Sequence, residues 1–167
     1  QTAEGYVLDD NVHTITIDYA DENTPIVVST ANLANQRQKI AISVEKQSAD
    51  GTLKLPGAEF ALYAGTDIVA DNRVLVTAGT CLATAVTGET GRLTFDIDLP
   101  MGKYLIGETK APAGYILSDE VQEVEAAWQG QDANTVYLTA VFTNEPVKVA
   151  ISKADATTGV ELDGAKL

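Results

Sequence analysis

An internal repeat dictates how this chain is organised. Tyr6 follows a glycine and precedes Asn35 by the same interval at which Tyr115, which also follows a glycine, precedes Asn144. A register that is kept at both ends of a segment indicates a repeated structural unit. The offset from Tyr6 to Tyr115, here called the repeat length, is about 110 residues and thus close to the commonest size of a protein domain.

A second pair of landmarks extends the repeat toward residue 167. Lys46 and Lys153 are related by nearly the same offset, and each stands at the end of a similar apolar run and at the same distance before a Gly-Ala pair. The sequence therefore predicts that these residues are part of a longer tandem array. Its parts are the C-terminal portion of one module (1–38), a complete module (39–146) and the first strand or strands of a third (147–167).

Short connectors join the predicted modules. Residues 35–39 and 144–148 contain neither Gly nor Ser. Connectors of this kind favour a stiff rod over a flexible string of beads. Neighbouring repeats of the same array are therefore the expected partners of each module.

Composition indicates an ordered, β-rich and strongly acidic protein. Apolar residues make up 45% of the chain and charged residues 21%, and Thr and Val are frequent. The formal net charge of −13 disfavours nucleic acid and anionic membrane surfaces as partners, because both would repel it. No apolar run reaches the length of a membrane span, and Gln1 does not begin a secretion signal. We therefore expect targeting information to lie outside these residues or not to exist.

Alternating segments bounded by turns predict an all-β sandwich. Turn signals such as Ala49-Asp50-Gly51 and Pro112-Ala113-Gly114 separate them, and no segment indicates a long helix. The stretch 65–84 is predicted as a hairpin or an extended loop. The predicted strands are 13–19, 40–46, 59–63, 91–97, 103–109 and 135–144.

Three polar residues stand where the two-residue period of a strand points inward: Lys46, Glu108 and Asn144. Each ends an otherwise apolar face. Burying an unpaired charge is costly, so we expect the three side chains to meet. The apolar residues on the three faces are Ile40, Ile42 and Val44; Tyr104 and Ile106; and Ala140 and Phe142.

Such a meeting would support a self-directed condensation. Burial favours a neutral amine and a protonated acid, and a dry core holds the partners at contact distance. Attack of the Lys46 amine on the side-chain carbon of Asn144, with Glu108 moving the proton and ammonia leaving, would form an isopeptide bond. The reaction is single-turnover, so the protein is not expected to be an enzyme. The link is expected near the points where the chain enters and leaves the module.

The run from Tyr104 to Tyr115, Tyr-Leu-Ile-Gly-Glu-Thr-Lys-Ala-Pro-Ala-Gly-Tyr, resembles the E-box of Cna B-type, prealbumin-like repeats from adhesins and pilins of Gram-positive bacteria. Residues 55–63 and 142–144 resemble the flanking signatures of these repeats. Ile106 departs from the leucine of the pattern. The resemblance implies an inverse immunoglobulin-like β-sandwich with an isopeptide bond between Lys46 and Asn144, formed with the help of Glu108.

The resemblance also implies a function and a location. It predicts a structural stalk module of an adhesin or pilus-like protein on the cell wall of a Gram-positive bacterium. The alternative is a module that itself binds a host or neighbouring-cell ligand through residues 65–84 or the loop around Trp128. Asn35 and Lys153 lack their partners in this chain, so any crosslink they form involves residues outside it.

Other readings compete with these predictions. Each of the three inward-facing polar residues also has a simpler interpretation when it is taken alone. Lys46 could extend along the surface from a strand end, Glu108 could form a salt bridge, and Asn144 could be a capping residue. His13 has no neighbouring ligand set and no phosphate-binding loop is present, so neither a metal nor a cofactor is predicted. Cys81 is the only cysteine, which excludes a disulfide within the chain. We expect it to be a small buried residue, and Trp128 to pack at a loop.

Overall fold

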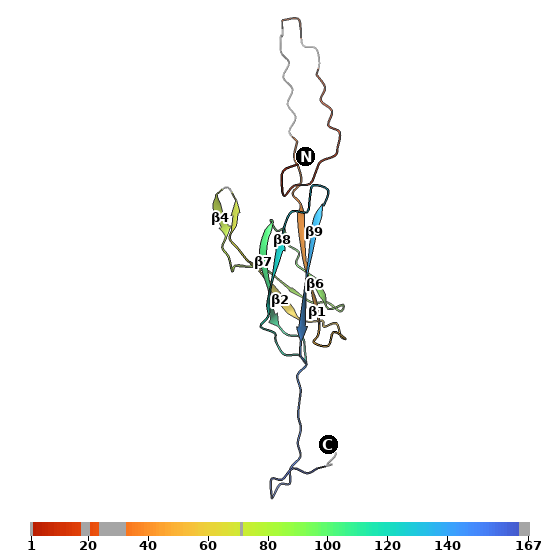
Figure 1. The fold of residues 1–167 in the computed structure, drawn as a ribbon, viewed down its shortest axis with the longest axis vertical. Coiled ribbons are helices and arrows are strands. Elements are labelled where there is room, and N and C mark those ends of the chain that lie inside the picture. Colours follow the sequence, from red (N-terminus) through yellow and green to blue (C-terminus); the bar gives the residue numbers. More distant parts are fainter. Residues whose placement is uncertain (1, 18–20, 24–32, 71, 164–167) are drawn as a thin grey trace.

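The computed structural model describes residues 2–17, 21–23, 33–70 and 72–163 and is built of strands, with no helix in this part of the chain (Figure 1). One sheet has the order β6-β1-β9 and a second has the order β5-β2-β7-β8. The predicted all-β sandwich is thereby confirmed. The strands are β1 (Lys39–Ser48), β2 (Glu59–Ala64), β3 (Ile68–Ala70), β4 (Arg73–Val76), β5 (Cys81–Val86), β6 (Arg92–Thr94), β7 (Gly102–Lys110), β8 (Val121–Ala126) and β9 (Thr135–Asn144).

The core lies between the two sheets, and the side chains of the strands alternate between core and surface as predicted. Every second residue of β1 is buried from Ile40 to Ser48. In β9 the alternation continues to Asn144, and the rings of Phe60 and Phe142 pack with their centroids 4.9 Å apart. The two-residue period therefore sorts the apolar side chains inward on both facing strands.

The first and last strands of the sandwich, β1 and β9, are parallel neighbours. Lys39 lies opposite Thr135, and Ser48 lies opposite Asn144. Because both strands run the same way, the chain enters the sandwich at one end and leaves it at the other (Figure 1). Lys46 lies toward the far end of β1 and Asn144 ends β9, so both residues lie near the exit of the chain. The expectation that they would also lie near the entrance is wrong.

Two strands were not predicted, and one predicted strand is absent in its described part. Strands β5 and β8 are the missed ones, although the segment 65–84 does contain the predicted hairpin, formed by β3 and β4. Residues 13–17 form no strand, and residues 18 and 19 lie outside the described residues. The predicted strand 91–97 shortens to β6.

Missing partners explain the absent strand. A shift by one repeat length places 13–19 on 122–128, which overlaps β8, and β8 is held by pairing with β7. Residues 2–17, 21–23 and 33–37 contain no strand that corresponds to β7, so the described residues 13–17 lack the kind of partner that holds β8. The same reason applies to residues 147–163, which form an isolated bridge between Ala154 and Glu161 but no strand.

The environment of Cys81 corrects a further prediction. This residue begins β5, an edge strand, and its side chain is exposed rather than buried. An edge strand has one hydrogen-bonded neighbour, here β2, so less of its surface is covered. Apolar character at a single position did not identify its side of the sheet.

Candidate functional site

The three inward-facing polar side chains come from three different strands and meet between the sheets. Lys46 lies on β1 and Asn144 on the adjacent β9, whereas Glu108 faces them from β7 in the other sheet. The exposed fractions are 0% for Lys46, 8% for Glu108 and 3% for Asn144. The parity of each strand, together with the packing of the sheets, therefore produces one buried polar cluster.

The contacts within the cluster form a closed triangle. The Nζ of Lys46 lies 2.5 Å from Oδ1 of Asn144 and 3.1 Å from Oε1 of Glu108. The Nδ2 of Asn144 donates to both carboxylate oxygens of Glu108 at 2.9 Å. The amide of Asn144 thus presents its oxygen to the amine and its nitrogen to the acid.

The surroundings of the amine are apolar. Desolvation by burial lowers the pKa of Lys46 below its ordinary value of 10.5, against the opposing effect of the hydrogen bond and charge of Glu108. The rings of Phe60 and Phe142 lie 5.5 and 5.8 Å from the Nζ, measured to their centroids. A neutral amine, which is the nucleophilic form, is therefore more accessible here than in water.

The backbone holds the carboxylate of Glu108 in place. The N–H of Ser118, in the loop between β7 and β8, donates to Oε2 of Glu108 at 2.9 Å. Sequence reasoning missed this contact, because a backbone donor carries no side-chain signature. The orientation of the acid toward Asn144 thus depends on a loop outside the strand that carries it.

The remaining predicted crosslinking residues lie elsewhere on the surface. Asn35 is exposed, and its Nδ2 donates to Oγ1 of Thr2 at 2.9 Å. Lys153 is also exposed, in the extended segment that leaves the sandwich. Neither is brought into the buried cluster, and no second cluster of the same kind is found among the described residues.

The other lysines, Trp128 and His13 lie outside the buried cluster. Lys103 pairs with Glu123 at 2.8 Å and retains an exposed side chain. Trp128 lies half-buried in the loop between β8 and β9, where its indole N–H is buried without a hydrogen-bond partner. His13 contacts Asp9 at 2.7 Å. Besides Lys153, the described lysines that are exposed and take no part in the cluster are Lys39, Lys54, Lys110 and Lys148.

A known protein family matches more than half of this chain. Residues 40–141 match the family model described as SpaA, prealbumin-like fold domain. No curated protein matches the chain. The described part of the chain contains no helix with the length and apolar character of a membrane span.

Several solved structures are similar to this chain. One is the Bacillus anthracis TIE protein, at 27% identity and a TM-score of 0.64, over 88% of this chain and 24% of that chain. Another is the group B streptococcus pilus 2b backbone protein, at 26% identity and a TM-score of 0.49, over 68% of this chain and 43% of that chain. The major pilin SpaD from Corynebacterium diphtheriae shares 24% identity, with a TM-score of 0.45, over 64% and 32%. This chain spans less than half the length of each.

Proposed function

This chain belongs to the family of SpaA prealbumin-like fold domains, and from that premise we propose that it is a structural stalk module of a Gram-positive adhesin or pilus-like protein. The module would hold a binding region away from the cell wall, outside the cell, in an array with neighbouring repeats. The observation that carries this proposal is the closed contact among the buried side chains of Lys46, Glu108 and Asn144.

The proposed reinforcement is an isopeptide bond made by the module itself. The neutral amine of Lys46 attacks the side-chain carbonyl carbon of Asn144, and a new C–N bond forms as the bond to Nδ2 breaks. Glu108 takes a proton from the attacking amine and gives one to Nδ2, which leaves as ammonia. The acid is regenerated, so no other reactant is consumed.

The geometry supports each step of this reaction. The amine contacts the amide oxygen, and the departing nitrogen is already hydrogen-bonded to the acid that would protonate it. Burial of all three groups removes the competing water and holds the reactants together, which can replace a slow bimolecular encounter by an intramolecular one.

A link at this position would control how the module bears force. Tension entering through β1 reaches Lys46, crosses the new bond to Asn144 at the end of β9, and leaves along the chain. The two residues are 98 positions apart, so the sequence between them would carry no load. The module would therefore resist extension under shear.

The experiment that tests the proposal is an intact mass measurement on the purified chain. We expect a deficit of about 17 Da, one ammonia, in the parent and in Lys54→Ala, and the full mass in Lys46→Ala. Lys54 is a matched control because it is an exposed lysine close to the same strand. Asn35 and Lys153 are proposed to bond only with residues outside this chain, so a single ammonia is expected. The full mass in the parent would refute the crosslink.

The projecting hairpin of β3 and β4 favours a second candidate function, ligand binding. It extends sideways from the sandwich (Figure 1), and Val69, Val74 and Leu75 are 56%, 51% and 62% exposed. Clustered exposed apolar residues often mark contact surfaces. Binding of the labelled chain to glycan arrays and immobilised matrix proteins would test this function. Loss of binding in Leu75→Ser, with retention in the control Val86→Ser on β5, would support it.

A further inference from the structure

Residues 2–17 and 33–37 are here called the N-terminal unit. The backbone contacts of this unit recur at the other end of the sandwich. An isolated bridge joins Tyr6 to Arg37, and an equivalent bridge joins Tyr115 to Pro146, one repeat length later. Three backbone N–H to carbonyl contacts follow the same shift. They are Tyr6 to Ala3 (3.2 Å), Val7 to Gln36 (2.8 Å) and Gln38 to Gly5 (2.8 Å), and Tyr115 to Pro112 (3.1 Å), Ile116 to Glu145 (2.9 Å) and Val147 to Gly114 (2.8 Å).

Gln38 connects this N-terminal unit to the complete sandwich. Its backbone N–H donates to the carbonyl of Gly5 at 2.8 Å, and its side chain contacts the loop between β8 and β9. There Nε2 donates to the carbonyls of Gly130 at 3.1 Å and Ala133 at 2.5 Å, and Oε1 accepts from the N–H of Gln129 at 3.0 Å. The side chain is thus satisfied at both ends, and Gln38 is 1% exposed.

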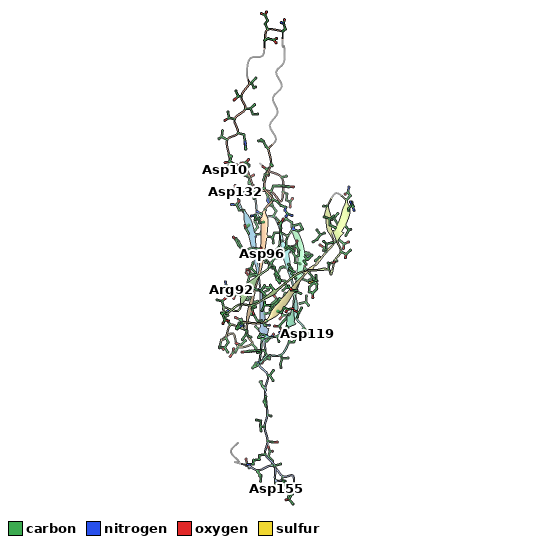
Figure 2. The ribbon with its side chains drawn as sticks, turned by 180° about the vertical axis from the view of Figure 1, so that it is seen from behind. Asp10, Arg92, Asp96, Asp119, Asp132 and Asp155 are labelled. Carbon is green, nitrogen blue, oxygen red and sulfur yellow. The ribbon has the colours of Figure 1, made fainter. Side chains whose placement is uncertain are left out.

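Direct contacts of the N-terminal unit with the sandwich surround Gln38. The N–H of Leu8 donates to the carbonyl of Gln131 at 2.9 Å, and that of Thr2 donates to the side-chain oxygen of Gln131 at 3.3 Å. Arg37 forms an ion pair with Asp98. Figure 2 labels Asp10 of the N-terminal unit and Asp132 of the loop at this same end of the sandwich.

We propose that Gln38, Asp98 and residues 129–134, here named the joint face, form a docking surface for the preceding module of the array. The occupant is the C-terminal end of that module, represented by residues 2–17 and 33–37. Hydrogen bonds from both the backbone and the side chain of one buried residue hold the two units in one orientation. This inference rests on the proposed stalk function and deepens it, because fixed joints turn a chain of modules into a rod.

The opposite end of the sandwich offers the matching partner surface. The repeat places Leu117 at the position of Leu8, and the N–H of Leu117 has no protein acceptor within the described part of the chain. Leu117 is also 53% exposed. Val147 occupies the position of Gln38, so a following joint would share the backbone contacts and lack the amide clamp. The two joints of one module would therefore differ in stiffness.

The test is amide hydrogen exchange, read residue by residue by NMR, on the full chain. In the parent we expect slow exchange at Leu8, whose N–H bonds across the joint to Gln131, and at Gln129, whose N–H bonds to the side chain of Gln38. Gln38→Ala should speed exchange at both by about tenfold or more, because it removes the hydrogen bonds that close the joint. Gln122→Ala is the matched control, since its side chain bonds to the carbonyl of Val141 away from the joint face.

Internal references separate a loosened joint from a damaged fold. The amide of Ile106 in the buried strand β7 should exchange equally slowly in all three proteins. If Gln38→Ala also speeds exchange at Ile106, the variant has lost its fold and the inference is tested on the parent alone. The Leu8 amide of the parent must then be protected from exchange. Exchange of Leu8 in the parent at the rate of an unstructured peptide would overturn the inference. A mass deficit with an unprotected Leu8 would refute the joint alone, and a protected Leu8 with the full mass would refute the crosslink alone.

Discussion

The amine of Lys46 and the side-chain oxygen of Asn144 lie 2.5 Å apart, although the residues are separated by 98 positions in sequence. They sit on parallel neighbouring strands, where Lys46 pairs with Phe142, two residues before Asn144. Two residues along a strand return to the same face, so both side chains enter the core. The proposed link therefore needs no distortion of the sheet to bring its partners together.

Removing the link should weaken the module substantially. A covalent loop of about this length stabilises a fold by about 4 to 5 kcal/mol through the unfolded chain. We expect Lys46→Ala to lose at least that much free energy of unfolding in denaturant titrations, whereas Lys54→Ala should remain within about 0.5 kcal/mol of the parent. Equal stability of the parent and Lys46→Ala would contradict a formed bond.

The loop that holds Glu108 should influence how fast the bond forms. Ser118→Pro removes the N–H that donates to Oε2 of Glu108, whereas Ser118→Ala retains it. We expect the fraction of chain lacking ammonia to rise more slowly after refolding in the proline variant, and at the parental rate in the alanine variant. Time-resolved intact mass would measure both. Parental kinetics in Ser118→Pro would show that the contact does not position the acid.

An unlinked variant should become more stable as the pH rises. Asn144→Ala prevents the bond and keeps Lys46 buried, where desolvation lowers the lysine pKa from 10.5. Between the lowered folded value and 10.5 the unfolded chain binds more protons than the folded one, so the unfolding free energy increases with pH through that window. Urea midpoints measured across it would report the rise. The double variant with Lys46→Met should lack this rise, and a falling midpoint in Asn144→Ala would reverse the assigned shift.

Gly91 should tolerate no side chain, because it lies against the backbone of Lys46. Its φ of +69° is in the left-handed region, and an added Cβ would lie 2.6 Å from the carbonyl oxygen of Lys46. We expect Gly91→Ala to cost more than about 1 kcal/mol through strain and contact. Gly88→Ala is the control, since its Cβ would meet only Arg92 at 3.8 Å. Thermal melts of the two variants would compare them, and similar melting temperatures would argue against a close approach.

Much of the fold was predictable because its signals are local. The burial of Ile42, Val44 and Lys46 on one face follows from alternation within a single strand. Strand β8 was missed, although the repeat links it to the segment 13–19, for which a strand was predicted. Shifting the predicted strand by one repeat length gives residues 122–128, which overlap β8. The repeat could therefore have identified β8 from the sequence.

By itself the sequence determined the periodic properties of this protein: the repeat, the β character and the face on which each polar residue lies. These follow from spacing along one chain, which is a one-dimensional property. Tertiary structure alone decided which segments became strands, since a strand needs a neighbour to receive its hydrogen bonds. It also decided the contacts among Lys46, Glu108 and Asn144. The same holds for the hydrogen bond from the N–H of Ser118 to Glu108 and for the backbone and side-chain hydrogen bonds of Gln38. Each of these depends on distances between atoms from separate segments, and packing of the two sheets and their loops sets those distances.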